Sequence, residues 1–166
     1  MTEAQLSNAM DAYGSTVYRL ALTRMQNIAD AEDVYQEVFL RLWKQAAEDW
    51  DGDRAKAWLI RTTLNRCADL HRFHLRRPVL SFAEIPDLAQ PEDESRELWE
   101  AVSRLPEKAR TAVHLYYAEG YSAEEISQLM HIPAATVRTR LHRARRQLKE
   151  LLGGNDDEAC VSRFDG

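Results

Sequence analysis

The sequence of 166 residues lacks the marks of cysteine-rich and membrane-embedded proteins. Its two cysteines, Cys67 and Cys160, lie far apart and form no paired-spacing motif, which argues against a disulfide framework and suits a reducing compartment. No apolar run approaches about 18 residues, the length that a membrane-spanning helix needs. The start of the chain has no basic segment followed by an apolar one, so no secretory signal is expected. We therefore expect a cytoplasmic protein without membrane insertion.

Glycine and proline are also scarce, with 6 and 5 residues, and the alternation of apolar and polar residues that is typical of strands is nowhere sustained. Both observations favour an all-helical chain. The sequence has no glycine-rich phosphate loop, no nucleophile motif between a strand and a helix, and no coherent acid/base pair. We therefore expect no enzymatic activity, no catalytic residue and no cofactor.

The formal net charge of -5 conceals an uneven distribution of charge along the chain. Residues 51–78 carry a net charge of +4 and residues 131–152 carry +5. An acidic stretch, residues 79–100, lies between these two basic blocks and carries a net charge of -6. Attraction to phosphate acts within a Debye length of about 8 Å at physiological salt, so these local blocks matter more than the total. The pattern predicts two separate basic surfaces, as in a protein that binds nucleic acid.

Three stretches with helical spacing of apolar residues fill the first half of the chain. The first runs over residues 6–25, and the second begins near Asp30, an expected N-cap that precedes an acidic first turn. The third is rich in arginine and is expected to end before Pro78. Residues 1–78 are thus expected to form one helical domain. Prolines without a clear period follow, so residues 79–93 are expected to form a flexible linker.

The second half carries the signals of a helix-turn-helix. Pro106 is expected at the first position of a helix that stops at Gly120, and Ser122 with Glu125 forms a capping-box pattern. A tight turn, "HIP", then leads to a basic helix that begins just past Pro133. This is the plan in which the second helix enters the major groove of DNA. Residues 94–152 form the expected domain, and residues 153–166, which begin with two glycines, an expected disordered tail.

The basic helix has two faces. An apolar stripe at spacings of four and three residues is expected to be buried. The remaining surface is positive, with an arginine able to pair with guanine O6 and N7. The expected stripe consists of Val137, Leu141, Ala144, Leu148 and Leu151, and the outer face carries Arg138, Thr139, Arg140, His142, Arg143, Arg146 and Lys149.

Two blocks of the sequence are similar to those of a known family. "DAEDVYQEVFLRLWK" with "AWLIRTTLNRCADLHRFHLRRP", and then "LPEKARTAVHLYYAEGYSAEEISQLMHIPAATVRTRLHRARRQLKELL", resemble the N-terminal and C-terminal domains of bacterial RNA polymerase sigma factors of the extracytoplasmic-function (ECF) group. The resemblance covers about residues 5–152. It implies an all-α protein that directs core RNA polymerase to promoters by recognising the minus 35 and minus 10 elements and promoting strand opening.

The resemblance also implies partners and site residues. The acidic helix would bind the clamp helices of the largest polymerase subunit, the C-terminal domain would meet the flap of the second-largest subunit, and an anti-sigma factor would control the protein. The implied polymerase-binding residues are Asp30, Glu32, Asp33, Gln36, Glu37 and Phe39, with Val34, Val38 and Leu42 facing the core.

For the minus 10 element, the resemblance implies that Asn65 reads an unstacked base, whereas Arg61, Arg66 and Arg72 reach phosphates. Trp58 is either a stacking surface or part of the core, and residues 49–56 would form the rim of the base pocket. For the minus 35 element, the resemblance implies base contacts by Arg138, Thr139, His142 and Arg143, with Arg140 and Arg146 at phosphates or at the helix end.

Two other classes of function remain open at this point. Cys67, His71 and His74 recur at helical spacing, so a zinc site and a metal-linked switch are conceivable, although a fourth ligand is missing. A generic transcriptional regulator would also carry a helix-turn-helix, but it has no reason to carry the blocks at residues 30–44 and 57–78.

Overall fold

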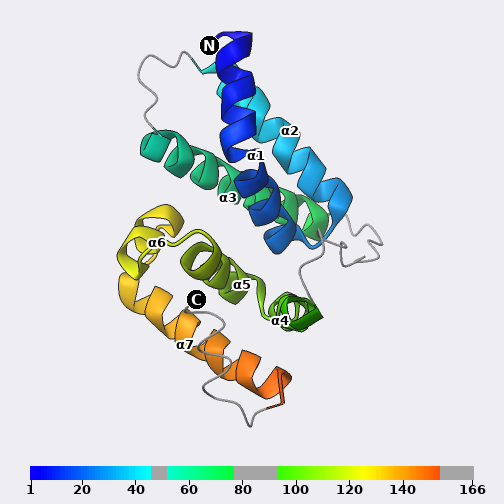
Figure 1. Ribbon diagram of the computed structural model, residues 1–166, viewed down its shortest axis with the longest axis vertical. Coiled ribbons are helices and arrows are strands. Elements are labelled where there is room, and N and C mark those ends of the chain that lie inside the picture. The colour runs from blue at the N-terminus through cyan, green and yellow to red at the C-terminus, as the bar shows by residue number, and fades with distance from the viewer. Residues whose placement is uncertain (46–51, 77–92, 154–166) are drawn as a thin grey trace. The chain divides into compact units, whose positions relative to one another are not determined.

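The computed structural model describes residues 1–45, 52–76 and 93–153, and every regular element in these ranges is a helix (Figure 1). The chain divides into two compact units, Met1–Pro86 and Asp87–Gly166. The prediction of an all-helical protein in two domains is therefore confirmed. Most of the expected linker, Pro78 and nearly all of the expected tail with Cys160 lie outside the described residues.

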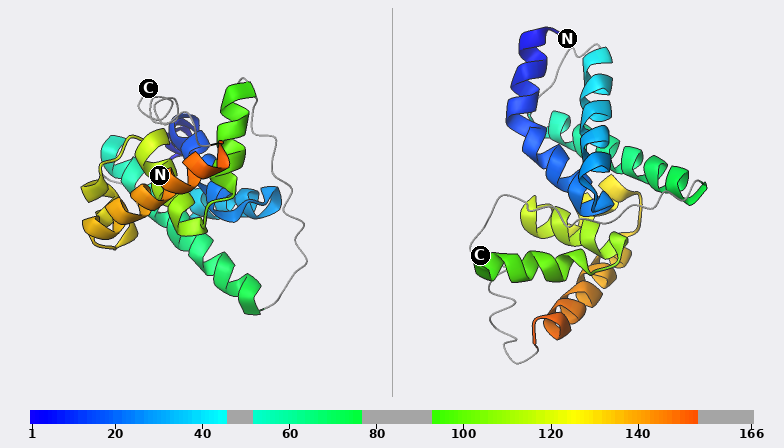
Figure 2. Two further views of the ribbon diagram at one scale, coloured as in Figure 1. Left: turned by 90° about the horizontal axis from the view of Figure 1, so that it is seen from below. Right: turned by 90° about the vertical axis from the view of Figure 1, so that its right-hand side faces the viewer.

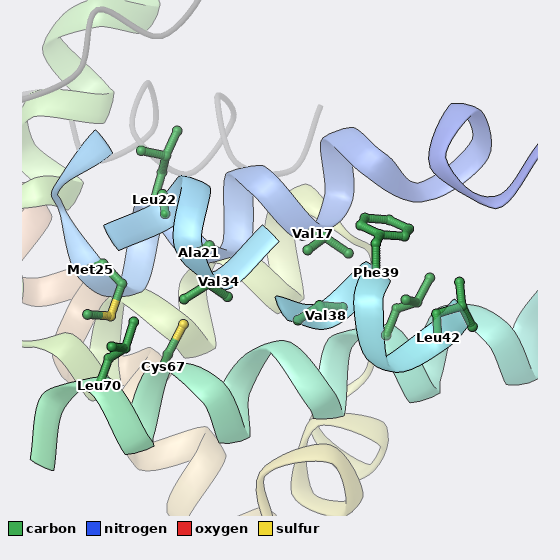
Figure 3. Packing of buried hydrophobic residues seen from close by; sticks show 12 residues of the cluster. Val17, Ala21, Leu22, Met25, Val34, Val38, Phe39, Leu42, Cys67 and Leu70 are labelled. Carbon is green, nitrogen blue, oxygen red and sulfur yellow. The ribbon is translucent and has the colours of Figure 1, made fainter. Parts of the chain in front are cut away.

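The first unit contains α1 (Glu3–Met25), α2 (Ile28–Lys44) and α3 (Gly52–Arg76), and each of these helices packs against the other two. Figures 1 and 2 show α3 crossing the pair formed by α1 and α2. Their apolar faces meet in one core, in which Val34, Val38 and Leu42 are buried as predicted (Figure 3). The buried residues of this core are Val17, Ala21, Leu22, Met25, Ala31, Val34, Val38, Phe39, Leu42, Leu59, Cys67 and Leu70.

The start of α2 differs from the prediction. Asn27, not Asp30, is the N-cap, and its side-chain oxygen accepts a hydrogen bond from the backbone N–H of Asp30 at 3.0 Å. An asparagine satisfies the orphan N–H groups of a first turn as well as an aspartate does. Asp30 instead lies inside the first turn, where its negative charge favours the positive end of the helix dipole.

A close approach between α1 and α2 depends on Gly14. A Cβ atom at this buried position would lie 3.1 Å from the hydroxyl oxygen of Tyr35, tighter than ordinary van der Waals contact. The Tyr35 ring also packs against Phe39, with 4.8 Å between ring centroids. Burial raises the pKa of Tyr35, and the nearby carboxylate of Asp11 raises it further. The phenol therefore stays neutral at physiological pH and fits this apolar contact.

The second unit contains α4 (Asp93–Ser103), α5 (Glu107–Val113), the π-helical turn η1 (His114–Ala118), α6 (Ala123–Met130) and α7 (Ala134–Leu151). Helices α4, α5 and α6 all contact α7. Pro106 is the N-cap of α5 rather than its first residue, a shift of one position. Gly120 follows the helical stretch with a φ of +75°, a conformation that favours glycine, so its role as a stop signal is confirmed.

The two faces of α7 are largely as predicted. Val137, Leu141, Ala144 and Leu148 are buried, but Leu151 is 42% exposed. The prediction for Leu151 was wrong because periodicity defines a helical face but not how far the neighbouring elements extend along it.

The capping box of α6 gives a direct test of the local fold. Ser122 accepts from the backbone N–H of Glu125 at 3.1 Å, and the Glu125 carboxylate accepts from the backbone N–H of Ser122 at 3.1 Å. We expect Ser122→Ala to lower the free energy of unfolding of the second unit by about 1 kcal/mol. Urea unfolding followed by circular dichroism measures the loss, and hydrogen exchange locates it in α6. The exposed Ser7→Ala on α1 is the control, and an equal loss in both variants would contradict the capping role.

Candidate nucleic-acid interface

The outer surface of α7 carries the predicted basic residues. Arg138, Thr139, His142, Arg143 and Arg146 are exposed, whereas Arg140 is half-buried. The Thr139 hydroxyl donates to the backbone carbonyl of Ala135 at 2.9 Å, so its proton is used within the helix. These predicted contact residues begin at Arg138, the fifth residue of α7, and continue for more than two turns. This is the part of a recognition helix that contacts DNA in a helix-turn-helix.

The turn between α6 and α7 is fixed by its own hydrogen bonds. His131 ends α6 in the left-handed conformation, with a φ of 55°. The Ser127 hydroxyl donates to the carbonyl of Ile132 at 2.5 Å, and the N–H of Ile132 donates back to the carbonyl of Ser127 at 3.2 Å. Helix α7 then begins directly after Pro133. The three-residue turn predicted from the sequence is confirmed, and it sets the angle at which α7 leaves α6.

Two long-range contacts of α7 were not predicted. A guanidinium nitrogen of Arg138 pairs with the carboxylate of Glu124 on α6, and both side chains are more than half exposed. Arg145 donates from Nε to the hydroxyl of Tyr117 at 2.5 Å and lies over the rings of Tyr116 and Tyr117, 5.7 and 5.6 Å from their centroids. No local pattern reveals these contacts, because the partners lie 14 and 28 residues apart.

The outer face of α3 carries the residues predicted for melted DNA. Arg61, Asn65 and Arg72 are exposed at spacings of four and seven residues, which places them on one helical face. Trp58 is half-buried and packs against the core of the first unit, so the structure favours its packing role. Ile60, next to Arg61 in the sequence, is fully buried. Residues 46–51, and with them part of the expected pocket rim, lie outside the described residues.

Two predicted site residues on different helices pair with each other. A guanidinium nitrogen of Arg66 on α3 lies 3.2 Å from the carboxylate of Asp33 on α2, and Arg66 is only 26% exposed. Nearby, the imidazole of His74 lies 3.1 Å from the carboxylate of Asp30, which is 22% exposed. Asp33 remains accessible at 56%, whereas the ion pair and the partial burial of Arg66 restrict the reach of its guanidinium toward DNA phosphate.

The outer face of α2 carries most of the predicted polymerase-binding residues. Glu32, Asp33 and Gln36 are exposed, and Glu37 is half-buried and pairs with Arg41 at 3.1 Å. Asp30 is partly buried against His74. Phe39 does not lie on this face. It is 4% exposed, inside the core beside Tyr35, and its assignment to the docking surface was wrong.

The sequence prediction missed the exposed apolar residues near the C-terminal end of α2. Leu40 is 47% exposed and Trp43 is 39% exposed. With Glu32 and Gln36 they are spaced by four, four and three residues, so they form one outward stripe. We call these four residues the α2 stripe. Helical spacing counted along the sequence from Glu32 would have placed Leu40 and Trp43 on the same face as Glu32 and Gln36.

The metal alternative finds no geometric support. Cys67 is fully buried among apolar residues of the core, and the Nε2 atom of His74 faces the Asp30 carboxylate. Within residues 1–45, 52–76 and 93–153, no three His, Cys, Asp or Glu side chains are placed to hold a metal ion. Over the same ranges, no helix is long and apolar enough to span a membrane.

Comparisons with known proteins match a different family model to each of the two units of the chain. The family model "Sigma-70 region 2" matches residues 9–77, and "Sigma-70, region 4" matches residues 95–148. The chain is 32% identical over 155 residues to the ECF RNA polymerase sigma factor SigM of Bacillus subtilis, with 87% of this chain and 94% of that protein covered.

A second relative is longer. The chain is 33% identical over 161 residues to the ECF RNA polymerase sigma factor SigE of Mycolicibacterium smegmatis, with 90% of this chain covered but only 62% of that protein. Among solved structures, the sigma factor RpoE of Bartonella quintana, in complex with the anti-sigma factor NepR, has a TM-score of 0.75 at 23% identity. The match covers 91% of this chain and 98% of that chain, and at this identity it shows a shared fold.

Proposed function

The chain belongs to the ECF group of RNA polymerase sigma factors, and we propose that it directs the core polymerase to specific promoters and promotes strand opening. The observation that carries the proposal is the presence in one chain of two different surfaces. The first unit has the α2 stripe, an acidic and apolar face suited to a protein partner, and the second has the basic outer face of α7. A factor that links an enzyme to DNA needs both.

We assign the roles by domain. Residues 1–78 bind the clamp helices of the largest polymerase subunit and the minus 10 element, and residues 94–152 bind the minus 35 element and the flap of the second-largest subunit. Residues 79–93 connect them, and residues 153–166 form the tail. Asn65 reads a base of the opened strand, with Arg61 and Arg72 at phosphates. The exposure of these three side chains on one face of α3 supports the assignment.

In the second domain, Arg138, Thr139, His142 and Arg143 contact bases, and Arg140 and Arg146 contact phosphates or support the helix end. Two DNA contacts on one chain raise each other's effective concentration, so each is able to be weak alone. The chain itself makes no bond, because RNA synthesis belongs to the polymerase. Its place of action is the cytoplasm.

An anti-sigma partner is part of the proposal. The sigma factor of Bartonella quintana with the same fold was solved bound to an anti-sigma factor. The apolar side chains of the α2 stripe are exposed when the chain has no partner bound. An anti-sigma factor that covers them would block access of the polymerase.

A generic regulator is the alternative, and core binding distinguishes the two. We expect purified core polymerase to retain the tagged chain, and the resulting complex to bind promoter DNA more tightly than scrambled DNA. Binding of duplex DNA without retention of the core enzyme would favour the regulator. Retention without any preference among DNA sequences would remove the promoter-reading role.

A further inference from the structure

The contact between Glu124 and Arg138 joins the two helices of the helix-turn-helix. Glu124 is the second residue of α6, and Arg138 is the fifth residue of α7. The contact is not needed to start either helix, because Glu125 completes the capping box with Ser122 and Pro133 is the N-cap of α7. Its two side chains are 61% and 58% exposed, so solvent and salt weaken it and its contribution to stability is small. Because Arg138 lies near the start of α7, the effect of the pair is expected in recognition.

The chemistry of the pair suggests what that effect is. A guanidinium carries five N–H donors in a planar fork, so a carboxylate that takes one edge leaves donors for guanine O6 and N7. The same carboxylate neutralises the charge that draws an arginine to any phosphate. It also limits the rotamers of a long side chain that is otherwise free in solvent.

We propose that Glu124 is a positioning residue that sets the sequence selectivity of Arg138. It holds the guanidinium of Arg138 in one orientation for base contact and reduces its use as a general phosphate anchor. The inference rests on the proposed function of α7 as the helix that reads the minus 35 element. Specificity here includes a repulsive element, because the carboxylate near the DNA lowers the affinity for all sequences.

Glu124→Gln removes the charge and keeps the shape of the side chain. We expect the variant to bind scrambled DNA more tightly, because one negative charge near the phosphates is lost and Arg138 is released. The affinity for the promoter sequence should increase less than the affinity for scrambled DNA, or decrease, because Arg138 loses its orientation. The ratio of promoter to scrambled affinity should fall roughly three- to tenfold, a part of what a bidentate base contact contributes.

The test uses holoenzyme reconstituted from core polymerase and the full chain. The probes are a duplex that wild-type holoenzyme selects from a random-sequence pool as its upstream element, and a scrambled duplex of equal composition. Fluorescence anisotropy gives both affinities for wild type, Glu124→Gln, Arg138→Ala and the double variant. Glu100→Gln, at an exposed position of α4, makes the same charge change outside the helix-turn-helix of α6 and α7 and is the matched control. Unfolding curves check that the fold is unchanged.

The expected result is a coupling between the two residues. Glu124→Gln lowers the affinity ratio in the wild-type background but leaves it unchanged in the Arg138→Ala background, and Glu100→Gln leaves the wild-type ratio unchanged. An unchanged ratio for Glu124→Gln, or an equal change in both backgrounds, would overturn the positioning role while α7 remains the reading helix. A wild-type holoenzyme whose preference does not depend on Arg138 would instead overturn the proposed role of α7, and this inference with it.

Discussion

Replacing Leu40 and Trp43 together by alanine is expected to lower the affinity of the chain for core RNA polymerase by at least about 100-fold. Both side chains are exposed at the apolar end of the α2 stripe. Tryptophan anchors are enriched among interface hot spots, each of which costs roughly 2 kcal/mol or more when truncated to alanine. Because neither residue is buried in the core of the first unit, the fold should be retained.

Surface plasmon resonance with immobilised core enzyme measures this loss. Met10→Ala is the matched control, because Met10 is an exposed apolar residue on α1 of the same unit, 36% exposed and outside the α2 stripe. We expect its affinity to stay within about twofold of wild type. Full core binding by the Leu40→Ala, Trp43→Ala variant would place the polymerase-binding surface on another face.

Arg138→Ala and Arg146→Ala are expected to have different effects on DNA binding by the holoenzyme. Arg138 lies near the start of α7, where base edges are read, so its loss should cost about 1 to 3 kcal/mol on the promoter sequence and relax the base preference. Arg146 lies two turns further along, and its loss should weaken promoter and scrambled DNA alike, with a salt dependence reduced by about one phosphate contact.

Affinities on both DNA sequences at several salt concentrations separate these outcomes. Thr136→Ala, a small change in the first turn of α7, controls for effects on the helix itself. Equal losses on promoter and scrambled DNA for both arginine variants would contradict the division between base and phosphate contacts.

Local signals in the sequence predicted the helix-turn-helix well. The capping box of Ser122 and Glu125, the turn after Met130 and the buried face of α7 each depend on residues a few positions apart, so the sequence displays them directly. The α3 residues Arg61, Asn65 and Arg72 were instead implied by the resemblance to sigma factors, and all three are exposed.

The sequence-based predictions failed where packing between helices determines whether a side chain is buried or paired. Phe39 was assigned to a partner surface, although it lies one position from Val38 and four from Tyr35 on the broad face that α2 buries. The buried face of a helix in a globular protein is wider than the narrow seam of a coiled coil. Two consecutive residues, 38 and 39, can therefore both lie in the core. The pairs Arg66 with Asp33 and Arg138 with Glu124 join different helices, and no spacing rule within one helix predicts them.

The central claim is that this chain makes core polymerase start transcription at specific promoters. Run-off transcription from a pool of genomic promoter fragments, with core enzyme in the presence and absence of the chain, tests it most directly. We expect discrete transcripts that appear only with the chain and are lost with Asn65→Ala, whose exposed amide on α3 would read the opened strand. The absence of such transcripts from a mixture in which the chain has bound core polymerase would contradict the account.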